Sequence, residues 1–323
     1  MKRIFKMMIA FAVAVCVLAL SSCGLSAKSA KFGLGTVPSY SAISANGEVN
    51  GKGTLDMTAA AVIIDKDGKI IDIKIDVAED TVEYTSSGEL LGLKSAATKR
   101  ESNMKRTGSK LSWAAQVDIF ENFCKGKTHG DITATLTPDG YGNAELVSLG
   151  CTIVLTDMAK AIEKACNAAK TCDIGGEYSL NLGAQASQSG KSASEEADGY
   201  GKITADVAAS VTDKNGRCVC AVLDSAEMNF TFDRSGASTV EKGKKLLTKR
   251  EQGYDYGMKK AGSKLEWFEQ ADAFAKICVG KTADEIKSLV TSAGYGNDEV
   301  LGSGCTIHIS NMAKAALKAI EQK

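Results

Sequence analysis

The residues best suited to chemistry are cysteines and threonines that recur at a fixed spacing. Two pairs of cysteines are each separated by 27 residues: Cys124 with Cys151, and Cys278 with Cys305. The second cysteine of each pair lies between a glycine and a threonine, in Gly150-Cys151-Thr152 and Gly304-Cys305-Thr306. Such a segment ahead of a helix offers backbone N–H groups and a favourable helix dipole to a phosphate. Both segments are therefore candidate ligand sites.

A glycine-flanked tyrosine precedes each of these segments. Tyr141 and Tyr295 both occur in the sequence Gly-Tyr-Gly-Asn. Core packing explains such an aromatic residue poorly, so both tyrosines are candidates for ligand contact. Trp113 and Trp267 instead recur at helical spacing with phenylalanines, which predicts core anchors.

The repeated cysteines leave two interpretations open. In an exported chain, Cys124 with Cys151 and Cys278 with Cys305 could each form a disulfide, which would stabilise the fold by about 3 kcal/mol. Alternatively, all four are small buried apolar residues, because Cys124 and Cys278 lie on the apolar faces of predicted helices.

Four further cysteines lie outside this pattern. Cys166 and Cys172 could join the end of a helix to the linker that follows it. Cys218 and Cys220 are two residues apart on a predicted strand, which places them on one face of the sheet. Their separation there is too large for an easy mutual bridge.

The N-terminal segment is typical of an export signal. Basic residues within the first six positions precede an apolar run over residues 7–20, which is shorter than the roughly 20 residues that a bilayer span needs. The following Leu20-Ser21-Ser22-Cys23-Gly24 resembles the bacterial lipobox, in which the cysteine is diacylated and becomes the new N-terminus. The resemblance implies a signal peptide over residues 1–22. It also implies that a lipid on Cys23 holds the mature protein on the outer face of the cytoplasmic membrane.

The rest of the chain contains an internal duplication. Residues 103–169 and 257–323 align without a gap and are identical at 31 of 67 positions. Upstream, residues 65–69 match residues 213–217. Two copies are too few for a solenoid, so we expect two globular domains in tandem, over residues 23–172 and 173–323, each folding by itself.

The first part of each copy is predicted to form β-sheet. Residues 71–77 alternate between apolar and polar side chains, the period of a half-buried strand. Asp67-Gly68 predicts a hairpin turn ahead of this strand, after an apolar strand over residues 60–64. Residues 81–85 are expected to form a third strand.

Helices are predicted in the second part of each copy. In the second copy three start signals occur: Ser263 with Glu266, Thr282 with Glu285, and Ser310. The first helix should end at Gly280 and the second at Gly294, with a short strand over residues 305–309 before the third. The predicted fold class is α+β, in two tandem copies of one domain, each an antiparallel sheet followed by two or three helices.

Composition excludes some functions. The 39 basic and 39 acidic residues balance, so the chain lacks the positive charge of a nucleic-acid-binding protein. Only two histidines occur, His129 and His308, which argues against a His-rich metal site. No nucleophile elbow, zinc-protease motif, phosphate loop or dinucleotide fingerprint is present, so no motif supports an enzyme. Lys99-Arg100 and Lys249-Arg250 are predicted to lie on the solvated surface.

The segment Ser303-Gly304-Cys305-Thr306, followed by an alanine-rich helix, resembles the Ser-Gly-Ala-Thr signature of the extracytoplasmic FMN-binding domain family of electron-transport proteins. In that family the last threonine accepts flavin through a phosphoester bond. The resemblance implies FMN as cofactor, Thr306 as its acceptor and Thr152 as the equivalent residue of the first copy. Leu149 stands where the first serine of the signature would be, so the first copy should bind more weakly.

The chain also resembles, over its whole length, duplicated lipoproteins of anaerobic Gram-positive bacteria, through Tyr256-Gly257-Met258 and residues 266–270. Three function classes stay open: a flavin-carrying electron-transfer lipoprotein with a redox partner, a module that binds a small molecule, and a structural envelope protein.

Overall fold

The computed structural model describes residues 30–105, 107–239 and 245–321. The predicted signal peptide, residues 1–22, and the predicted lipid-bearing Cys23 lie outside these ranges. We refer to residues 30–172 as the first half and to residues 173–321 as the second half.

The two halves repeat one order of elements, three long strands followed by helices. The first half contains β1 (Lys31–Ile43), β2 (Gly51–Ile64), β3 (Ile70–Tyr84), α1 (Lys99–Ser102), α2 (Trp113–Cys124), α3 (His129–Thr133), α4 (Ala144–Leu149), α5 (Thr156–Ala168) and β4 (Lys170–Thr171). The second half contains β5 (Tyr178–Lys191), β6 (Gly199–Asp213), β7 (Cys218–Phe232), α6 (Lys249–Gln252), the 3₁₀ helix η1 (Gly253–Tyr256), α7 (Trp267–Cys278), α8 (Ala283–Lys287), α9 (Asp298–Gly302) and α10 (Ser310–Glu321). The protein is thus a mixed α+β fold, as the sequence predicts.

Both sheets are antiparallel, with strand orders β3-β2-β1-β4 and β5-β6-β7. The predicted hairpin turn is present between β2 and β3, where Asp65 Oδ1 accepts the N–H groups of Asp67 and Lys69 at 2.8 and 2.9 Å. Asp213 makes the same two bonds between β6 and β7. Residues 81–85 are not a separate strand, because β3 runs without interruption from Ile70 to Tyr84.

The predicted helix starts are partly confirmed. Thr282 caps α8 through a capping box with Glu285, and α10 begins at Ser310. The N-cap of α7 is Glu266 rather than Ser263, since Glu266 forms its capping box with Glu269. Helix α8 ends at Lys287, before the expected Gly294, and α9 follows as an additional helix.

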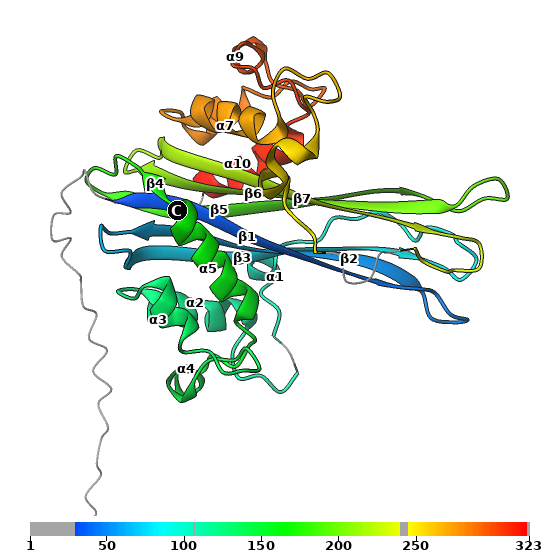
Figure 1. Cartoon of the computed structure of the whole chain (residues 1–323), viewed down its shortest axis with the longest axis horizontal. Coiled ribbons are helices and arrows are strands. Elements are labelled where there is room, and N and C mark those ends of the chain that lie inside the picture. Colours follow the sequence, from blue (N-terminus) through cyan, green and yellow to red (C-terminus); the bar gives the residue numbers. More distant parts are fainter. Residues whose placement is uncertain (1–29, 106, 240–244, 322–323) are drawn as a thin grey trace, which may run out of the picture.

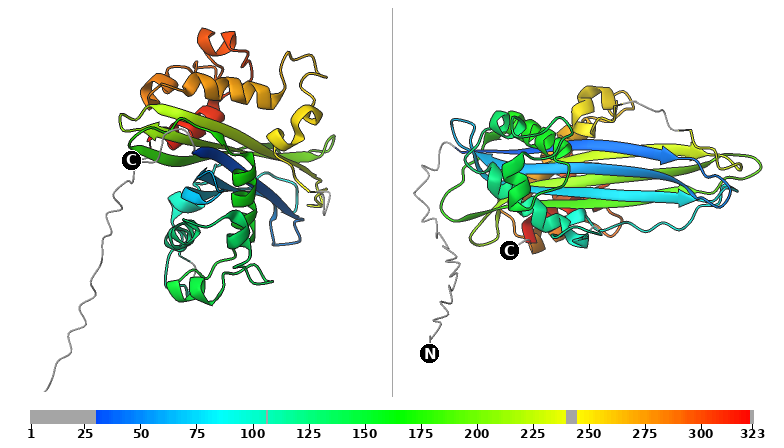
Figure 2. Two further views of the ribbon diagram at one scale, coloured as in Figure 1. Left: turned by 60° about the vertical axis from the view of Figure 1, so that its left-hand side comes forward. Right: turned by 90° about the horizontal axis from the view of Figure 1, so that it is seen from below.

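The two sheets pack face to face, so that β3 faces β5, β2 faces β6 and β1 faces β7. Helices α2 to α5 cover the outer face of the first sheet, and α7 to α10 cover that of the second (Figure 1). The fold therefore has four layers, helix, sheet, sheet and helix. At one end the strands extend beyond both helical layers (Figure 2).

An apolar core between the sheets contains residues from both halves. At the end that the helices leave uncovered, Tyr84 of β3 stacks on Phe232 of β7, with ring centroids 4.0 Å apart. Phe230 lies between two glycines of opposite sheets: a Cβ atom on Gly53 or Gly201 would approach its ring to 2.3 or 2.5 Å. The aromatic rings therefore occupy space that only glycine leaves open.

The last helix of each half packs directly on a strand of its own sheet. A Cβ atom on Gly35 of β1 would lie 2.1 Å from the carbonyl oxygen of Ala161 in α5. A Cβ atom on Gly183 of β5 would lie 2.2 Å from the carbonyl oxygen of Ala315 in α10. Small residues on both sides thus bring helix and strand backbones together.

The segments around Lys99-Arg100 and Lys249-Arg250 are structural, so the prediction that they are solvated surface is wrong. Arg100 donates to the outward-facing carbonyl oxygen of Ile75 on the edge strand β3, at 3.0 and 3.2 Å. Arg250 likewise donates to the carbonyl oxygen of Leu223 on the edge strand β7, at 2.8 and 3.0 Å. Proteins commonly protect sheet edges with basic side chains.

Two lysines of the terminal helices link the halves. Lys164 of α5 donates to the carbonyl oxygen of Thr36 in β1 and pairs with Glu251 of α6 at 2.6 Å. Lys318 of α10 donates to the carbonyl oxygen of Ala184 in β5 and pairs with Glu101 of α1 at 2.9 Å. Each half thus supplies one lysine and one glutamate to the other half.

This shared core predicts that neither half folds alone. Residues 30–172 and 173–321, produced separately, should show no cooperative thermal transition as soluble monomers, because each would expose the inner face of its sheet. Produced together, they should form a one-to-one complex with a sharp melting transition by circular dichroism. A separate half that stays monomeric and melts cooperatively would contradict this expectation.

Candidate functional site

The two threonines predicted to bind a ligand are held in the same way. The N–H group and the hydroxyl group of Thr306 both donate to Gln270 Oε1, at 2.8 and 3.2 Å. Thr152 makes the same pair of bonds to Gln116 Oε1, at 2.8 and 3.0 Å. Both glutamines are buried on the first long helix of their half, whereas both threonine side chains are exposed. Each hydroxyl group is thus oriented by its glutamine, on a threonine residue that is itself exposed.

Residues 305–309 are not a strand, contrary to the sequence-based expectation. No neighbouring strand pairs with this segment; instead the N–H group of Ile309 donates to the carbonyl oxygen of Gly294 at 2.8 Å. Gly304 has a φ of 97°, in the left-handed region that favours glycine. The segment is a sharp irregular turn from α9 into α10.

Three of the four backbone donors expected to bind a phosphate at this turn, those of Ser303, Gly304 and Thr306, have partners within the protein. The N–H group of Ser303 donates to carbonyl oxygens of α9. The Ser303 hydroxyl group donates to the carbonyl oxygen of Val300 at 2.7 Å. Gly304 N–H donates to the carbonyl oxygen of Leu301 at 3.0 Å. Together with the Thr306 bond to Gln270, these contacts engage three of the predicted phosphate donors within the protein.

The glycine-flanked tyrosines are exposed, as a ligand contact would require. Tyr295 is 47% exposed and lies edge-on to His308, with ring centroids 5.3 Å apart. Tyr141 is 43% exposed. Each lies in the loop between the two short helices of its half, Tyr141 between α3 and α4 and Tyr295 between α8 and α9, ahead of its Gly-Cys-Thr segment.

The four repeated cysteines are free, buried thiols. The disulfide alternative for Cys124 with Cys151 and for Cys278 with Cys305 is therefore not formed in this structure. Burial raises the pKa of the Cys305 thiol to about 11 and raises that of Cys124 even further, so both are protonated at neutral pH. They pack as small apolar residues beneath the helices.

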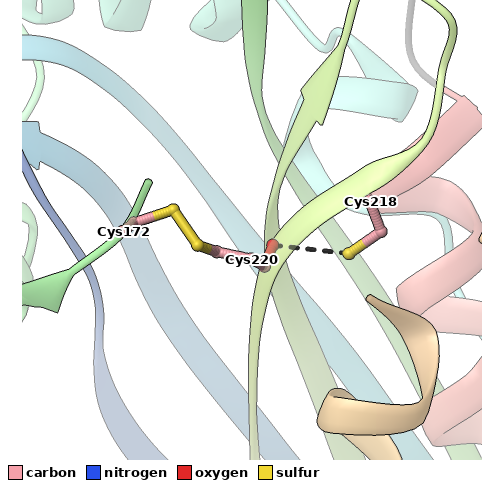
Figure 3. Close-up of a disulfide and its surroundings, with 3 residues drawn as sticks. All are labelled: Cys172, Cys218 and Cys220. Carbon is pink, nitrogen blue, oxygen red and sulfur yellow. Dashed lines mark hydrogen bonds between the residues drawn. A yellow bond between two sulfur atoms is a disulfide. The ribbon is translucent and has the colours of Figure 1, made fainter. Parts of the chain in front are cut away.

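The disulfide joins Cys172, just after β4, to Cys220 of β7, and so links the two halves (Figure 3). The predicted link between Cys166 and Cys172 is absent, since Cys166 is a free thiol. A bulge near the start of β7 also overturns the prediction that Cys218 and Cys220 share a face. Cys218 packs among the helices of the second half, and its thiol donates to the carbonyl oxygen of Cys220 at 3.5 Å.

A cavity of about 410 Å³ lies beside this disulfide, between the two halves. One wall comes from β1 and from the end of α5 and β4, and includes Phe32, Leu34 and Ala168. The other comes from β7 and α7, and includes Val222 and Val279. Its volume lies in the range of pockets that hold small organic ligands.

Charged groups surround this mainly apolar cavity. Arg250 pairs with Asp272 at 2.8 Å. Lys170 and Lys276 also line the cavity and are exposed, and neither has an ion-pair partner among residues 30–105, 107–239 and 245–321. Because the arginine and the aspartate neutralise each other, the two lysines leave the rim positively charged.

The corresponding positions of the first half have different chemistry. Cys220 and Val222 of β7 correspond to Asp72 and Lys74 of β3, 148 residues earlier. Val279 corresponds to Lys125, and Lys125 pairs with Asp72 at 3.0 Å. An ion pair thus occupies positions where the second half presents apolar side chains to the cavity.

A buried carboxylate supports the Arg100 cluster of the first half. Glu121 Oε1 accepts the outward-facing N–H group of Ile75 at 2.6 Å and pairs with Arg100 at 2.7 Å. Burial raises the pKa of Glu121 to about 7, although Arg100 acts in the opposite direction. This cluster closes the edge of the sheet.

In the part of the chain that the structure describes, no three His, Cys, Asp or Glu side chains form a metal-binding group. Among the same residues no helix has the length and hydropathy needed to cross a membrane. The sequence-based analysis did not identify the cavity. A usable signal was the presence of uncharged residues in the second half at the positions aligned with Asp72, Lys74 and Lys125.

Comparisons with protein-family models, with curated proteins and with solved structures found no match for this chain.

The raised pKa of Glu121 predicts that stability falls as pH increases. Between pH 4.5 and about 7 the folded state holds a proton that the unfolded state has released, so rising pH favours unfolding. Glu121→Gln should reduce the loss of unfolding free energy between pH 4.5 and 8 by up to about 3 kcal/mol, measured by urea denaturation. Asp118→Asn, which removes the exposed partner of Arg100, is the control. An unchanged pH profile for Glu121→Gln would contradict the assignment.

Proposed function

We propose that the protein is an exported, lipid-anchored binding protein built from two tandem copies of one α+β domain, and that it holds a small apolar ligand in the cavity between the copies. It acts by binding rather than by catalysis. The observation that carries the proposal is the apolar cavity beside Cys172 and Cys220.

The repeated contacts support the tandem duplication. The bonds from Thr152 to Gln116 and from Thr306 to Gln270 recur 154 residues apart. The interactions of the Asp65 and Asp213 turns recur at an interval of 148 residues. Equivalent contacts at nearly constant intervals are what duplication of one folded unit would produce.

The disulfide supports export. Disulfides persist in oxidising compartments outside the cytoplasm. The lipobox-like segment ending in Cys23 accounts for an anchor to the membrane without a spanning helix.

The difference between the copies supports a binding role for this cavity. If its residues served only to close the sheet edge, the Asp72–Lys125 ion pair of the first half would serve equally well in the second. Uncharged residues at Cys220, Val222 and Val279 instead leave apolar surface facing a space of ligand size.

A neutral apolar dye tests the binding site. N-phenyl-1-naphthylamine should bind the protein with one-to-one stoichiometry and a rise in fluorescence. Val279→Trp, which adds bulk to a half-exposed residue of the cavity wall, should weaken this binding at least tenfold. Ala168→Trp adds bulk to the opposite wall of the cavity and should weaken dye binding to a similar extent.

The matched control is Lys125→Trp, which places the same side chain at the equivalent helix end of the first half. Circular dichroism melting shows whether each variant is folded. Absence of saturable binding, or equal binding by the folded wild-type, Val279→Trp and Ala168→Trp proteins, would overturn the proposed function.

Flavin carriage is a second candidate function. It is favoured by the exposed residues Thr306 and Thr152, whose hydroxyl groups are held by their glutamines in the same way. Because the N–H groups of Ser303, Gly304 and Thr306 already have partners, a flavin here would depend mainly on a phosphoester bond to the hydroxyl oxygen rather than on noncovalent phosphate binding. FMN would be the cofactor, and a redox protein the partner.

Mass spectrometry of protein from the native membrane fraction tests both the anchor and this second candidate. The mature N-terminus should be an acylated Cys23, and Cys23→Ala should release the protein or block its maturation. Membrane association that is unchanged in Cys23→Ala would contradict the anchor. A flavin mononucleotide adduct on the peptide that contains Thr306 would support flavin carriage, and its absence would count against it.

A further inference from the structure

The cavity combines an apolar interior with an unbalanced positive rim. Its interior includes Phe32, Leu34 and Val222, from both halves. Lys170, just after α5, and Lys276 on α7 stand on opposite walls. Among the residues that the structure describes, Asp272 is the one acidic member of the lining, and it is paired with Arg250. A ligand that satisfies all of these groups needs an apolar body and a negative charge.

We infer that the cavity selects an anionic amphiphile, which is a single hydrocarbon chain that ends in a carboxylate. The hydrocarbon chain lies between the edges of the two sheets, and the carboxylate lies between Lys170 and Lys276. This inference rests on the proposed ligand-binding function and names the chemistry of its ligand. A lysine ammonium group is a flexible point charge that can follow such a head group. Burial of the chain supplies affinity, and the two lysines supply selectivity.

The charge pattern favours an anion over the alternatives. A cationic amphiphile would bring a third positive charge to a rim where the acid is already paired. A neutral chain would gain from burial but leave both lysines without a counter-charge. The anion is the ligand for which the charges of rim and head group are complementary.

Competition against the bound neutral dye tests the inference with the full-length mature protein. Dodecanoate and dodecyltrimethylammonium have the same chain length and opposite charge. Below their micelle concentrations and in low salt, dodecanoate should displace the dye at a concentration at least tenfold lower than dodecyltrimethylammonium. Raising the salt concentration should reduce that difference, because exposed charges are screened.

Charge reversal assigns the selectivity to the rim. The double variant Lys170→Glu with Lys276→Glu should weaken dodecanoate binding at least tenfold more than it weakens binding of the neutral dye. The control, Lys287→Glu with Lys314→Glu, changes the net charge equally at exposed positions outside the cavity and should retain selectivity.

The outcomes separate this inference from the proposed function. If the dye binds but the two detergents displace it equally, or if both double variants behave alike, the cavity binds ligands without charge selectivity and the inference fails. If the dye does not bind, the proposed function fails first. The inference would also be overturned if dodecanoate displaced the dye only when incorporated into neutral phosphatidylcholine vesicles and not as a monomer. The protein would then recognise carboxylates on a membrane surface rather than a free amphiphile.

Discussion

The structure depends on the packing of one antiparallel sheet against the other. Strands of 13 to 15 residues supply inner faces that are apolar over most of their length, and each half alone would leave such a face in water. Burying both faces against each other removes that apolar surface from solvent. Phe230 illustrates the fit, because it lies between Gly53 of one sheet and Gly201 of the other. A side chain at either glycine would collide with the ring.

Closing the edges of this sandwich requires charged side chains. Each sheet has edge strands whose outward-facing carbonyl groups lack a partner strand, and Arg100, Arg250, Lys164 and Lys318 each donate to one of them. The same lysines pair with glutamates of the opposite half. One set of interactions therefore protects the edges against pairing with another chain and aligns the halves.

The cavity arises where the two halves differ. Asp72 and Lys125 form an ion pair in the first half, whereas Cys220 and Val279 occupy the equivalent positions of the second. Cys220 instead forms the disulfide with Cys172, so a covalent link between the halves stands where the first half has one partner of an ion pair. Within the described ranges of the chain, the apolar space beside that link has no counterpart at the equivalent ion pair of the first half. The Gly-Cys-Thr turns remained similar in both halves, since Gln116 and Gln270 use their threonines to hold the chain before the last helix.

The sequence by itself determined the features that depend on neighbouring residues. The Asp65 turn, the start of α10 at Ser310 and the order of sheet before helices follow from local hydrogen bonding and from periodicity. Only the tertiary structure decided which distant residues meet. Cys172 lies 48 residues from Cys220, and no local pattern distinguishes that partner from Cys166. The roles of Arg100 and Arg250 likewise depend on strands that lie more than 20 residues away. Pairing between distant residues is set by how whole faces pack, because the burial of a face is a property of both surfaces that meet.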